Sequence, residues 1–175
     1  MILYHFTAIS LLDPILRDGL TRGDVPLSPE GGMNAVWFTT DPSPSGHGLS
    51  DGSKLNPAML AEVERRAGKK FPEGIGTPDK RRVRITVVIP SRNPLLKSWL
   101  PYARRRLERS WLETLTETGG GKSKAQTWFI YLGSVAATSF KAVEIRREDG
   151  AYTPMTEADR IEAAQHSDAA PASKW

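Results

Sequence analysis

The apolar residues of this chain are gathered in short runs. The two longest runs, Val83–Ile89 and Thr127–Val135, have the length of a β-strand and fall well short of the roughly 20 residues that a membrane helix requires. From Arg82 to Ile89, β-branched apolar residues occupy every second position, which is typical of a strand with one buried face. We therefore expect a fold organised around a β-sheet, with no membrane-spanning segment.

Two further strands and a helix are predicted near the N-terminus. Ile2–Thr7 is apolar, aromatic and β-branched, as expected of a buried strand, and Ala35–Thr40 has the same character. Between them, apolar residues at helical spacing follow Thr7, which can cap a helix. Gly19 is placed as the C-terminal stop of that helix, and a loop over residues 21–34 leads to the second strand.

Two helices are predicted in the middle of the chain. Asn56, followed by a proline at the first helical position, opens a short helix that ends near Gly68. Apolar positions spaced by three or four residues predict a second helix, continuous from Pro101 to about Leu115. Three successive glycines at 119–121 end it.

A β-hairpin made of Thr127–Val135 and Phe140–Arg146 is predicted to complete the fold. From residue 149 the chain is rich in alanine, aspartate and proline. We expect residues 149–175 to be a flexible tail with at most a short helix around Glu157–Ala164. Residues 1–148 are therefore predicted to form a single α+β domain, since 175 residues is close to the roughly 150 of an average domain.

Several classes of site are excluded by composition. The chain has no cysteine, so disulfides, thiolate metal sites and cysteine nucleophiles are ruled out. The three histidines, His5, His47 and His166, have no metal-ligand spacing, and we expect no metal. The N-terminus has no basic segment before its apolar residues, unlike a secretory signal. Together with the absence of cysteine, this favours a cytoplasmic location.

Positive charge is concentrated in one part of the chain. Residues 69–109 hold 12 of the 24 lysines and arginines and only three acidic residues, so this segment carries +9 and the remainder −5. Such an excess favours a polyanionic partner, although a run of charge is also what a solvated surface shows.

Aromatic residues are interleaved with these cations. Trp99, Tyr102 and Trp111 lie among the arginines, where exposed rings could stack on unpaired bases. Trp111 falls on an apolar stripe and is expected in the core. The residues predicted to contact nucleic acid are Arg81, Arg82, Arg84, Arg104, Arg105 and Arg109.

Three segments of the sequence resemble the opening of ADP-ribosyltransferase folds. They are Leu3-Tyr4-His5-Phe6-Thr7, Ile15-Leu16-Arg17-Asp18-Gly19-Leu20 and Val36-Trp37-Phe38-Thr39-Thr40-Asp41. Similar openings occur in poly-ADP-ribose polymerases, in DNA-modifying toxin ADP-ribosyltransferases and in RNA 2′-phosphotransferases. A late segment, Gln126–Tyr131, matches by pattern alone, and residues 42–125 match nothing in the family. The resemblance implies split antiparallel β-sheets with flanking helices.

The resemblance also implies a binding site for NAD, the substrate of these enzymes. His5 would hydrogen-bond a ribose hydroxyl of NAD. The backbone of Phe6 and the hydroxyl of Thr7 would bind the nicotinamide amide. Trp37, where the family has tyrosine, would stack on the nicotinamide ring, and Phe38 would pack in the core.

The sequence departs from the family at the third catalytic position. Many transferases place a glutamate there, and this chain has Thr127 or Gln126. Either side chain can orient a nucleophile, but neither offers the negative charge that favours a cation-like ribose. Glu144 could take that place only if the strand register differs from the one predicted.

The function implied is therefore an NAD-dependent ADP-ribosyltransferase that transfers a single ADP-ribose to a nucleic acid or a protein. Two other functions remain open. An enzyme like the RNA 2′-phosphotransferases would aim further basic residues, such as Arg17 or Arg22, at an RNA phosphate. A non-enzymatic module would bind nucleic acid or ADP-ribose through the basic middle of the chain.

Each candidate residue also has a purely structural interpretation. A histidine inside an apolar strand is commonly buried and bonded to a backbone carbonyl, which would account for His5. Trp37 and Phe38 could be neighbouring aromatic residues that only pack. For His47, in a Pro/Ser/Gly-rich loop between Gly46 and Gly48, the sequence favours an exposed side chain without a function.

Overall fold

The computed structural model describes residues 1–21, 23–29, 31–72 and 74–169. The strands are β1 (Ile2–Thr7), β2 (Asp24–Pro26), β3 (Gly32–Asn34), β4 (Val36–Thr39), β5 (Val83–Val88), β6 (Leu96–Ser98), β7 (Trp128–Tyr131), β8 (Phe140–Arg146) and β9 (Tyr152–Pro154). The helices are α1 (Leu12–Asp18), α2 (Pro57–Ala67), α3 (Trp99–Ala103), α4 (Arg109–Thr118), α5 (Lys122–Ala125) and α6 (Glu157–Ala169), with 3₁₀ turns η1 (Ile9–Leu11) and η2 (Ala137–Ser139).

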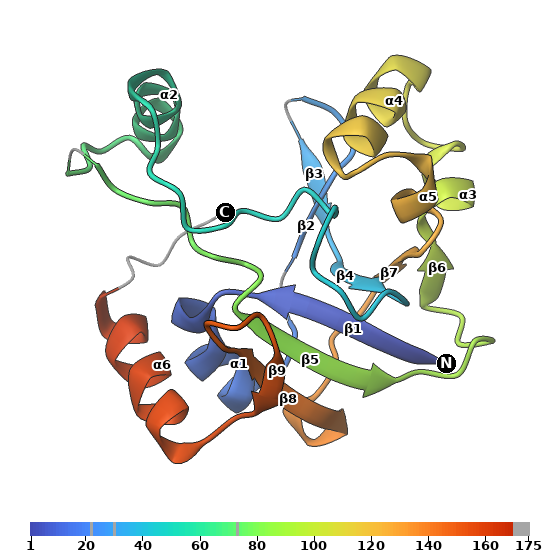
Figure 1. Cartoon of the computed structure of the whole chain (residues 1–175). Helices are drawn as coiled ribbons and strands as arrows, with labels where there is room; N and C mark the ends of the chain where they lie inside the picture. The colour runs from blue at the N-terminus through green and yellow to red at the C-terminus, as the bar shows by residue number, and fades with distance from the viewer. Residues whose placement is uncertain (22, 30, 73, 170–175) are drawn as a thin grey trace.

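These elements form one α+β domain, as the sequence predicts. Seven strands make an antiparallel sheet in the order β6-β7-β4-β1-β5-β8-β9, and β2 pairs with β3 in a separate ribbon. Because neighbours in the sheet are rarely neighbours in the chain, most of the pairing is long-range. Figure 1 shows the sheet between two groups of helices, with α2 standing away from it.

The sheet is almost divided between β4 and β1. β1 pairs with β5 along its whole length, from Ile2↔Val88 to Thr7↔Val83. On its other edge, β1 pairs with β4 only at Tyr4↔Thr39. The sheet therefore consists of two well-paired halves, β6-β7-β4 and β1-β5-β8-β9, joined at one point.

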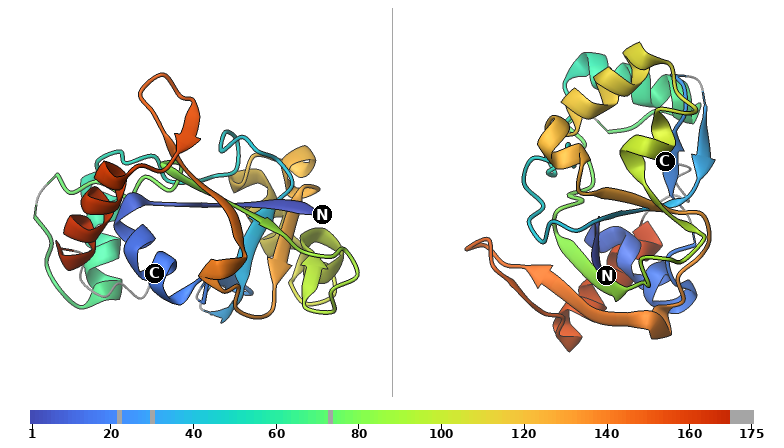
Figure 2. Two further views of the ribbon diagram at one scale, coloured as in Figure 1. Left: turned by 90° about the horizontal axis from the view of Figure 1, so that it is seen from below. Right: turned by 90° about the vertical axis from the view of Figure 1, so that its right-hand side faces the viewer.

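Each face of the sheet has its own core. One face packs against α1 and α6 and contains the buried side chains of Leu3, Phe38 and Ile85. The opposite face, on the β4–β7 half, packs against α3, α4 and the β2–β3 ribbon around Trp99 and Ile130. The two groups of helices occupy opposite ends of the molecule in Figure 1, and both views of Figure 2 show the β8–β9 connection projecting from the sheet.

Two of the helix ends predicted from capping residues are confirmed, at Gly19 and Asn56, whereas Thr7 is the last residue of β1 and caps no helix, because the 3₁₀ turn η1 precedes α1. Helix α1 ends at Asp18, and Gly19 has a left-handed φ of 81° with its N–H bonded to the carbonyl of Ile15. The side chain of Asn56 accepts a hydrogen bond from the backbone N–H of Met59 at the start of α2. These signals are local, so they can be interpreted without knowledge of the fold.

The predicted helix from Pro101 to Leu115 is wrong, because the structure has two helices there. Helix α3 ends at Ala103, whose carbonyl accepts the N–H groups of Arg106 and Leu107 in a turn. Glu108 has an extended backbone, and α4 starts after it. Apolar spacing cannot separate the two outcomes, because a single turn between two helices preserves the interval of three to four residues.

Two predictions for the C-terminal third are also wrong. Strands β7 and β8 do not form a hairpin: β7 pairs with β4 and β6, whereas β8 pairs with β5 and β9. Residues 149–169 are not a flexible tail, because they supply β9 and α6. A carboxylate on α6, that of Asp159, forms a two-bond ion pair with Arg147, and Ala163 is buried in the core. Residues 170–175 of the predicted tail lie outside the described residues.

Over the described residues, none of the helices combines the length and the apolar character needed to cross a bilayer.

Candidate functional site

His5 lies where the two halves of the sheet part. Its Nδ1 is 2.9 Å from the backbone carbonyl oxygen of Trp37 on β4, so the imidazole ring bridges β1 and β4 just beyond their single backbone pair. A carbonyl oxygen only accepts, so Nδ1 carries the proton when the ring is neutral. Burial lowers the pKa of His5 more than this hydrogen bond raises it. The ring is therefore neutral at pH 7, and Nε2 offers a lone pair.

That Nε2 atom and the hydroxyl of Thr7 are both available as ligand groups. Neither has a hydrogen-bond partner among the described residues. His5 and Thr7 are two residues apart on β1, so they project from the same face of the strand. The two groups could together hold a polar ligand.

Trp37 and Phe38 separate onto the two faces of β4. The Phe38 ring meets the His5 ring edge-on at 6.0 Å between centroids and is buried, as the resemblance implies. The Trp37 indole is on the opposite face, 4.6 Å from Trp99 and 6.0 Å from Trp128. Its Nε1–H donates to the carbonyl of Asp24. The structure thus brings the His5 ring to the backbone of Trp37, while the indole packs in a cluster of tryptophans.

Phe6 lies on the other face of β1 from His5. Its ring is 6.3 Å from His47 and 6.2 Å from Tyr152. This side chain is therefore a packing residue, and only its backbone is left for the role that the resemblance implies.

Of the two candidates for the third position, Thr127 is fully engaged in hydrogen bonds. Its hydroxyl donates to the carbonyl of Lys124 at 2.7 Å and therefore accepts from the hydroxyl of Thr39 at 2.8 Å. Thr39 in turn accepts from the backbone N–H of Asp41. This chain of hydrogen bonds fastens β4 to the segment before β7, and it leaves the Thr127 hydroxyl without a free proton.

Gln126 has an exposed side chain without a hydrogen-bond partner among the described residues. Together with Trp99, Arg104 and Trp128, it lines a cavity of about 330 Å³ beside α3. Gln126 precedes β7, which pairs with the strand of Trp37. Its side chain is free to reach a ligand, but Trp128 in the same cavity shares the Trp37 face of the sheet and not the face of His5.

Glu144 is placed away from His5. It lies on β8, two strands from β1, and both of its oxygens accept from Arg84 at 2.9 Å. Phe6 pairs with Arg84 and Arg84 with Glu144, and directly paired residues share a face of a sheet. Glu144 is therefore on the face of Phe6 and not on that of His5.

His47 is the site-like residue that sequence reasoning missed. Its side chain is 5% exposed, whereas the loop composition favoured an exposed one. Nδ1 accepts from the indole N–H of Trp128 at 2.8 Å, and Nε2 is 3.4 Å from Asp41. Lys124 donates to the same carboxylate oxygen at 2.5 Å. No local signal marks this histidine, since its partners come from positions up to 81 residues away.

The pKa values in this cluster follow from burial and from the lysine. Burial and the charge of Lys124 lower the pKa of His47, and the nearby Asp41 opposes them only in part. Burial alone would raise the pKa of Asp41, but hydrogen bonds from Lys124 and from the backbone of Ser43 outweigh it and lower the pKa. At pH 7 the cluster is therefore a charged lysine–aspartate pair beside a neutral histidine.

Four of the predicted nucleic-acid contacts are paired with acidic residues. Arg81 lies 3.4 Å from Asp79, and Arg82 lies 3.7 Å from Glu162. Arg84 is held by Glu144 between the rings of Tyr4 and Tyr152. Arg109 pairs with Glu113 one turn along α4. These cations are partly neutralised within the chain.

The remaining two, Arg104 and Arg105, have no ion pair among the described residues, and the same holds for their neighbours Lys97 and Arg106. These four cations surround α3. The predicted basic surface therefore divides into a paired part on β5 and α4 and a free part at α3.

No group of three or more histidine, aspartate and glutamate side chains within the described part of the chain is arranged to hold a metal ion. Comparisons with known proteins found no matching family model, no matching curated protein and no matching solved structure.

Proposed function

We propose that this protein is an NAD-dependent ADP-ribosyltransferase that transfers single ADP-ribose units, with its NAD site at the split between β1 and β4. The observation that carries the proposal is His5. It is half-buried at the point where the sheet opens, it is fixed in one tautomer by the Trp37 carbonyl, and it keeps an acceptor nitrogen for a ribose hydroxyl. The neighbouring hydroxyl of Thr7 supplies a second contact.

The topology supports the fold that the resemblance implies. The two halves of the antiparallel sheet are joined only at the pair Tyr4↔Thr39. Without that pair they would be two separate sheets, as in a split-sheet fold. The helices flank both halves. His5 on β1, Trp37 on β4 and Gln126 before β7 come from three segments far apart in the sequence, and β4 lies between the other two strands.

The reaction is a displacement at the ribose carbon that carries nicotinamide. The bond from that carbon to the nicotinamide nitrogen breaks, and its electron pair leaves with nicotinamide. A bond forms from the acceptor's oxygen or nitrogen to the same carbon, and the acceptor releases its proton to the solvent. The transition state is loose and cation-like, so the protein mainly positions NAD and excludes water.

The residues divide this work between them. His5 accepts from the ribose, and Thr7 and the backbone of Phe6 bind the nicotinamide amide. The Trp37 indole is held by Trp99 and Trp128, so stacking on nicotinamide would require NAD to reach its face of β4. Gln126 replaces Thr127 as the group that would orient the acceptor, because the Thr127 hydroxyl is already engaged, and it makes the same demand on NAD as Trp37 does. An amide orients without offering a negative charge, which favours slow transfer.

Calorimetric titration with NAD tests this proposal. We expect the wild-type chain to bind NAD and His5→Ala to lose at least about tenfold in affinity, which corresponds to roughly 1.4 kcal/mol. Ile2→Ala, an exposed position on the same strand, serves as the matched control and should bind as the wild type does. Circular dichroism checks that both variants are folded. The proposal fails if folded wild-type protein does not bind NAD or if His5→Ala binds it equally well.

Transfer itself is measured with NAD labelled in its adenylate part. We expect label to appear on an acceptor from a mixture of DNA, RNA and protein, and Gln126→Ala to slow the transfer without changing NAD affinity. An activity like that of RNA 2′-phosphotransferases gains no support at Arg17, which is exposed and paired with Asp18, and Arg22 lies outside the described residues.

A further inference from the structure

We infer that the groove around α3 binds the backbone of a single-stranded nucleic acid. This inference does not rest on the proposed function. It is argued from the shape of the groove, its free charges and the aromatic side chain in its wall.

The groove is made of two cavities on either side of α3. The larger, of about 390 Å³, is lined by Leu96, Lys97, Ser98, Pro101, Tyr102, Arg105, Arg106 and Leu132. The smaller, of about 330 Å³, includes Arg104 and Gln126. Ser98 and Pro101 line both cavities, so the two cavities adjoin at the start of α3.

The charges of this groove are all positive and free. Lys97, Arg105 and Arg106 line the larger cavity and Arg104 the smaller one. None of the four has an acidic partner among the described residues. In contrast, the arginines on β5 and just before it are paired with carboxylates of the chain; they are Arg81, Arg82 and Arg84. Free cations at close spacing repel one another, and phosphate groups between them would relieve that repulsion.

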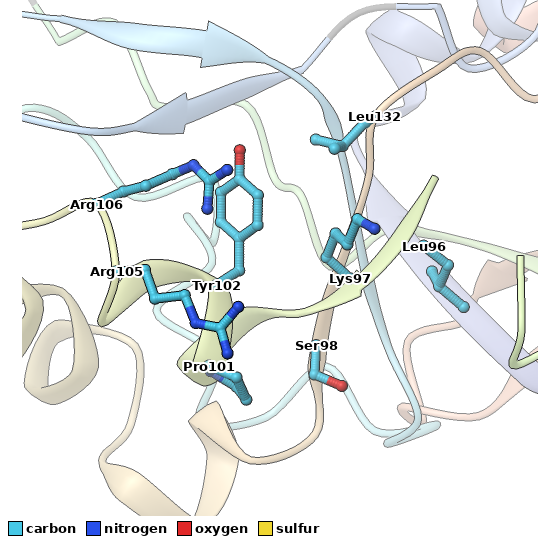
Figure 3. A pocket seen from close by; sticks show the side chains of 8 residues that line it. All are labelled: Leu96, Lys97, Ser98, Pro101, Tyr102, Arg105, Arg106 and Leu132. Carbon is cyan, nitrogen blue, oxygen red and sulfur yellow. The ribbon is translucent and has the colours of Figure 1, made fainter. Parts of the chain in front are cut away.

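An aromatic side chain forms part of the groove wall. Tyr102 is half-buried, its hydroxyl donates to the sulfur of Met33, and the guanidinium of Arg106 lies 3.9 Å from the centre of its ring. Figure 3 shows the guanidinium groups of Arg105 and Arg106 close to this ring, with Lys97 and Leu132 on the other side of the cavity. Arg106 is thereby held over the Tyr102 ring, where its other side could contact a base.

This combination favours a single strand over an acidic protein surface. Carboxylates on a protein require only cations, whereas this groove adds a tyrosine, a ring-stacked arginine and the apolar side chains of Leu96 and Leu132. Bases can use such surfaces only when they are unpaired. The smaller cavity adds a further guanidinium, that of Arg104, and the side chain of Gln126 along the same path.

Binding of a fluorescent oligothymidylate and a matching oligouridylate, measured at several salt concentrations, tests the inference. We expect the triple variant Lys97→Gln, Arg105→Gln, Arg106→Gln to lose about tenfold or more in affinity. The slope of log affinity against log salt should become shallower by roughly 2, at about 0.7 per lost phosphate contact with a single strand. Tyr102→Leu should lower affinity without changing that slope.

A matched control removes the same charge from other elements. The triple variant Arg17→Gln, Arg65→Gln, Arg160→Gln lies on α1, α2 and α6 and should retain wild-type affinity and slope. Equal losses in both triple variants would overturn the inference, because net charge alone would then explain binding. Polyglutamate that binds as tightly as the oligonucleotides would also overturn it, in favour of an acidic protein partner.

The NAD titration separates this inference from the proposed function. If the α3 triple variant binds NAD as the wild type does and loses only the oligonucleotide, the groove binds the strand and not NAD. If it loses NAD and keeps the oligonucleotide, the inference is wrong and the groove binds the dinucleotide. If oligonucleotide binding depends on α3 but the protein does not bind NAD, the inference stands and the proposed function fails.

Discussion

His5 and His47 are held in opposite tautomers by their first hydrogen bonds. His5 Nδ1 faces a carbonyl oxygen, which only accepts, so the proton is on Nδ1. His47 Nδ1 faces the indole N–H of Trp128, which only donates, so its proton is on Nε2. We expect ¹⁵N-resolved NMR of the side chains at pH 7 to show one ring of each kind. Two identical tautomers would contradict these hydrogen bonds.

The pH dependence of these rings follows from the same contacts. The pKa of each is lowered from the ordinary 6.5, chiefly by burial. In the unfolded chain both rings therefore gain a proton at a higher pH than in the folded chain. Stability is full above pH 6.5 and decreases as the pH falls towards the folded-state pKa values. Urea unfolding at pH 7 and pH 5.5 should show this decrease, and it should be smaller in His47→Gln.

At the scale of elements, the loop that carries His47 is seated on the turn after α4. A Cβ added to Gly120 would lie 1.7 Å from the carbonyl oxygen of Gly46, and Gly120 has a φ of +96°. Gly121 has a similar φ of +89°, but a Cβ there would meet nothing within 4 Å. Both glycines therefore have a positive φ that other residues rarely adopt, and they differ in their contact with the loop.

We expect Gly120→Ala to be much the more destabilising of the two substitutions. Gly121→Ala should cost about 2 kcal/mol, because a φ of 89° with a ψ of 179° is a conformation that only glycine adopts readily. Gly120→Ala adds the displacement of the loop, so the total should reach about 3 kcal/mol or more. Urea denaturation measures both. If the two variants were equally stable, the loop would not rest on this turn.

Elements were predictable where the signal is local. Ile2–Thr7 was predicted as a strand at its observed bounds, and Gly19 ended its helix as expected. Helix α6 was missed beyond a short segment because its buried contacts come from Ala163 and from the pairing of Asp159 with Arg147. A small side chain and a distant ion pair leave almost no apolar periodicity in the sequence.

At the scale of the whole molecule, the sheet order could not be predicted from the sequence. The position of His5 beside β4 depends on a single backbone pair between strands about 35 residues apart, and that of His47 depends on Trp128. Such pairings are set by which apolar faces can be buried together, and several arrangements satisfy the same alternation. The candidate residues on β1 could therefore be named from the sequence, whereas their neighbours could not.

The C-terminal segment closes the core on the α1 face, so the protein should not fold without it. Removal of residues 149–175 would expose the core around Leu3, Leu12 and Ile145, which α6 and β9 help to enclose. We expect this truncated chain to lack a cooperative thermal unfolding transition. A stable folded protein ending at residue 148 would contradict the structure and would support the domain boundary at residue 148 that the sequence predicts.

A pair of substitutions on α6 tests the same point without shortening the chain. Ala163 is 1% exposed and Ile161 is 53% exposed on the same helix. Ala163→Asp places a carboxylate in the core without a partner and should destabilise the protein by about 3 kcal/mol or more. Ile161→Asp introduces the same charge into the solvent and should change stability by less than about 1 kcal/mol. Equal effects in urea denaturation would mean that α6 does not pack on the sheet through Ala163.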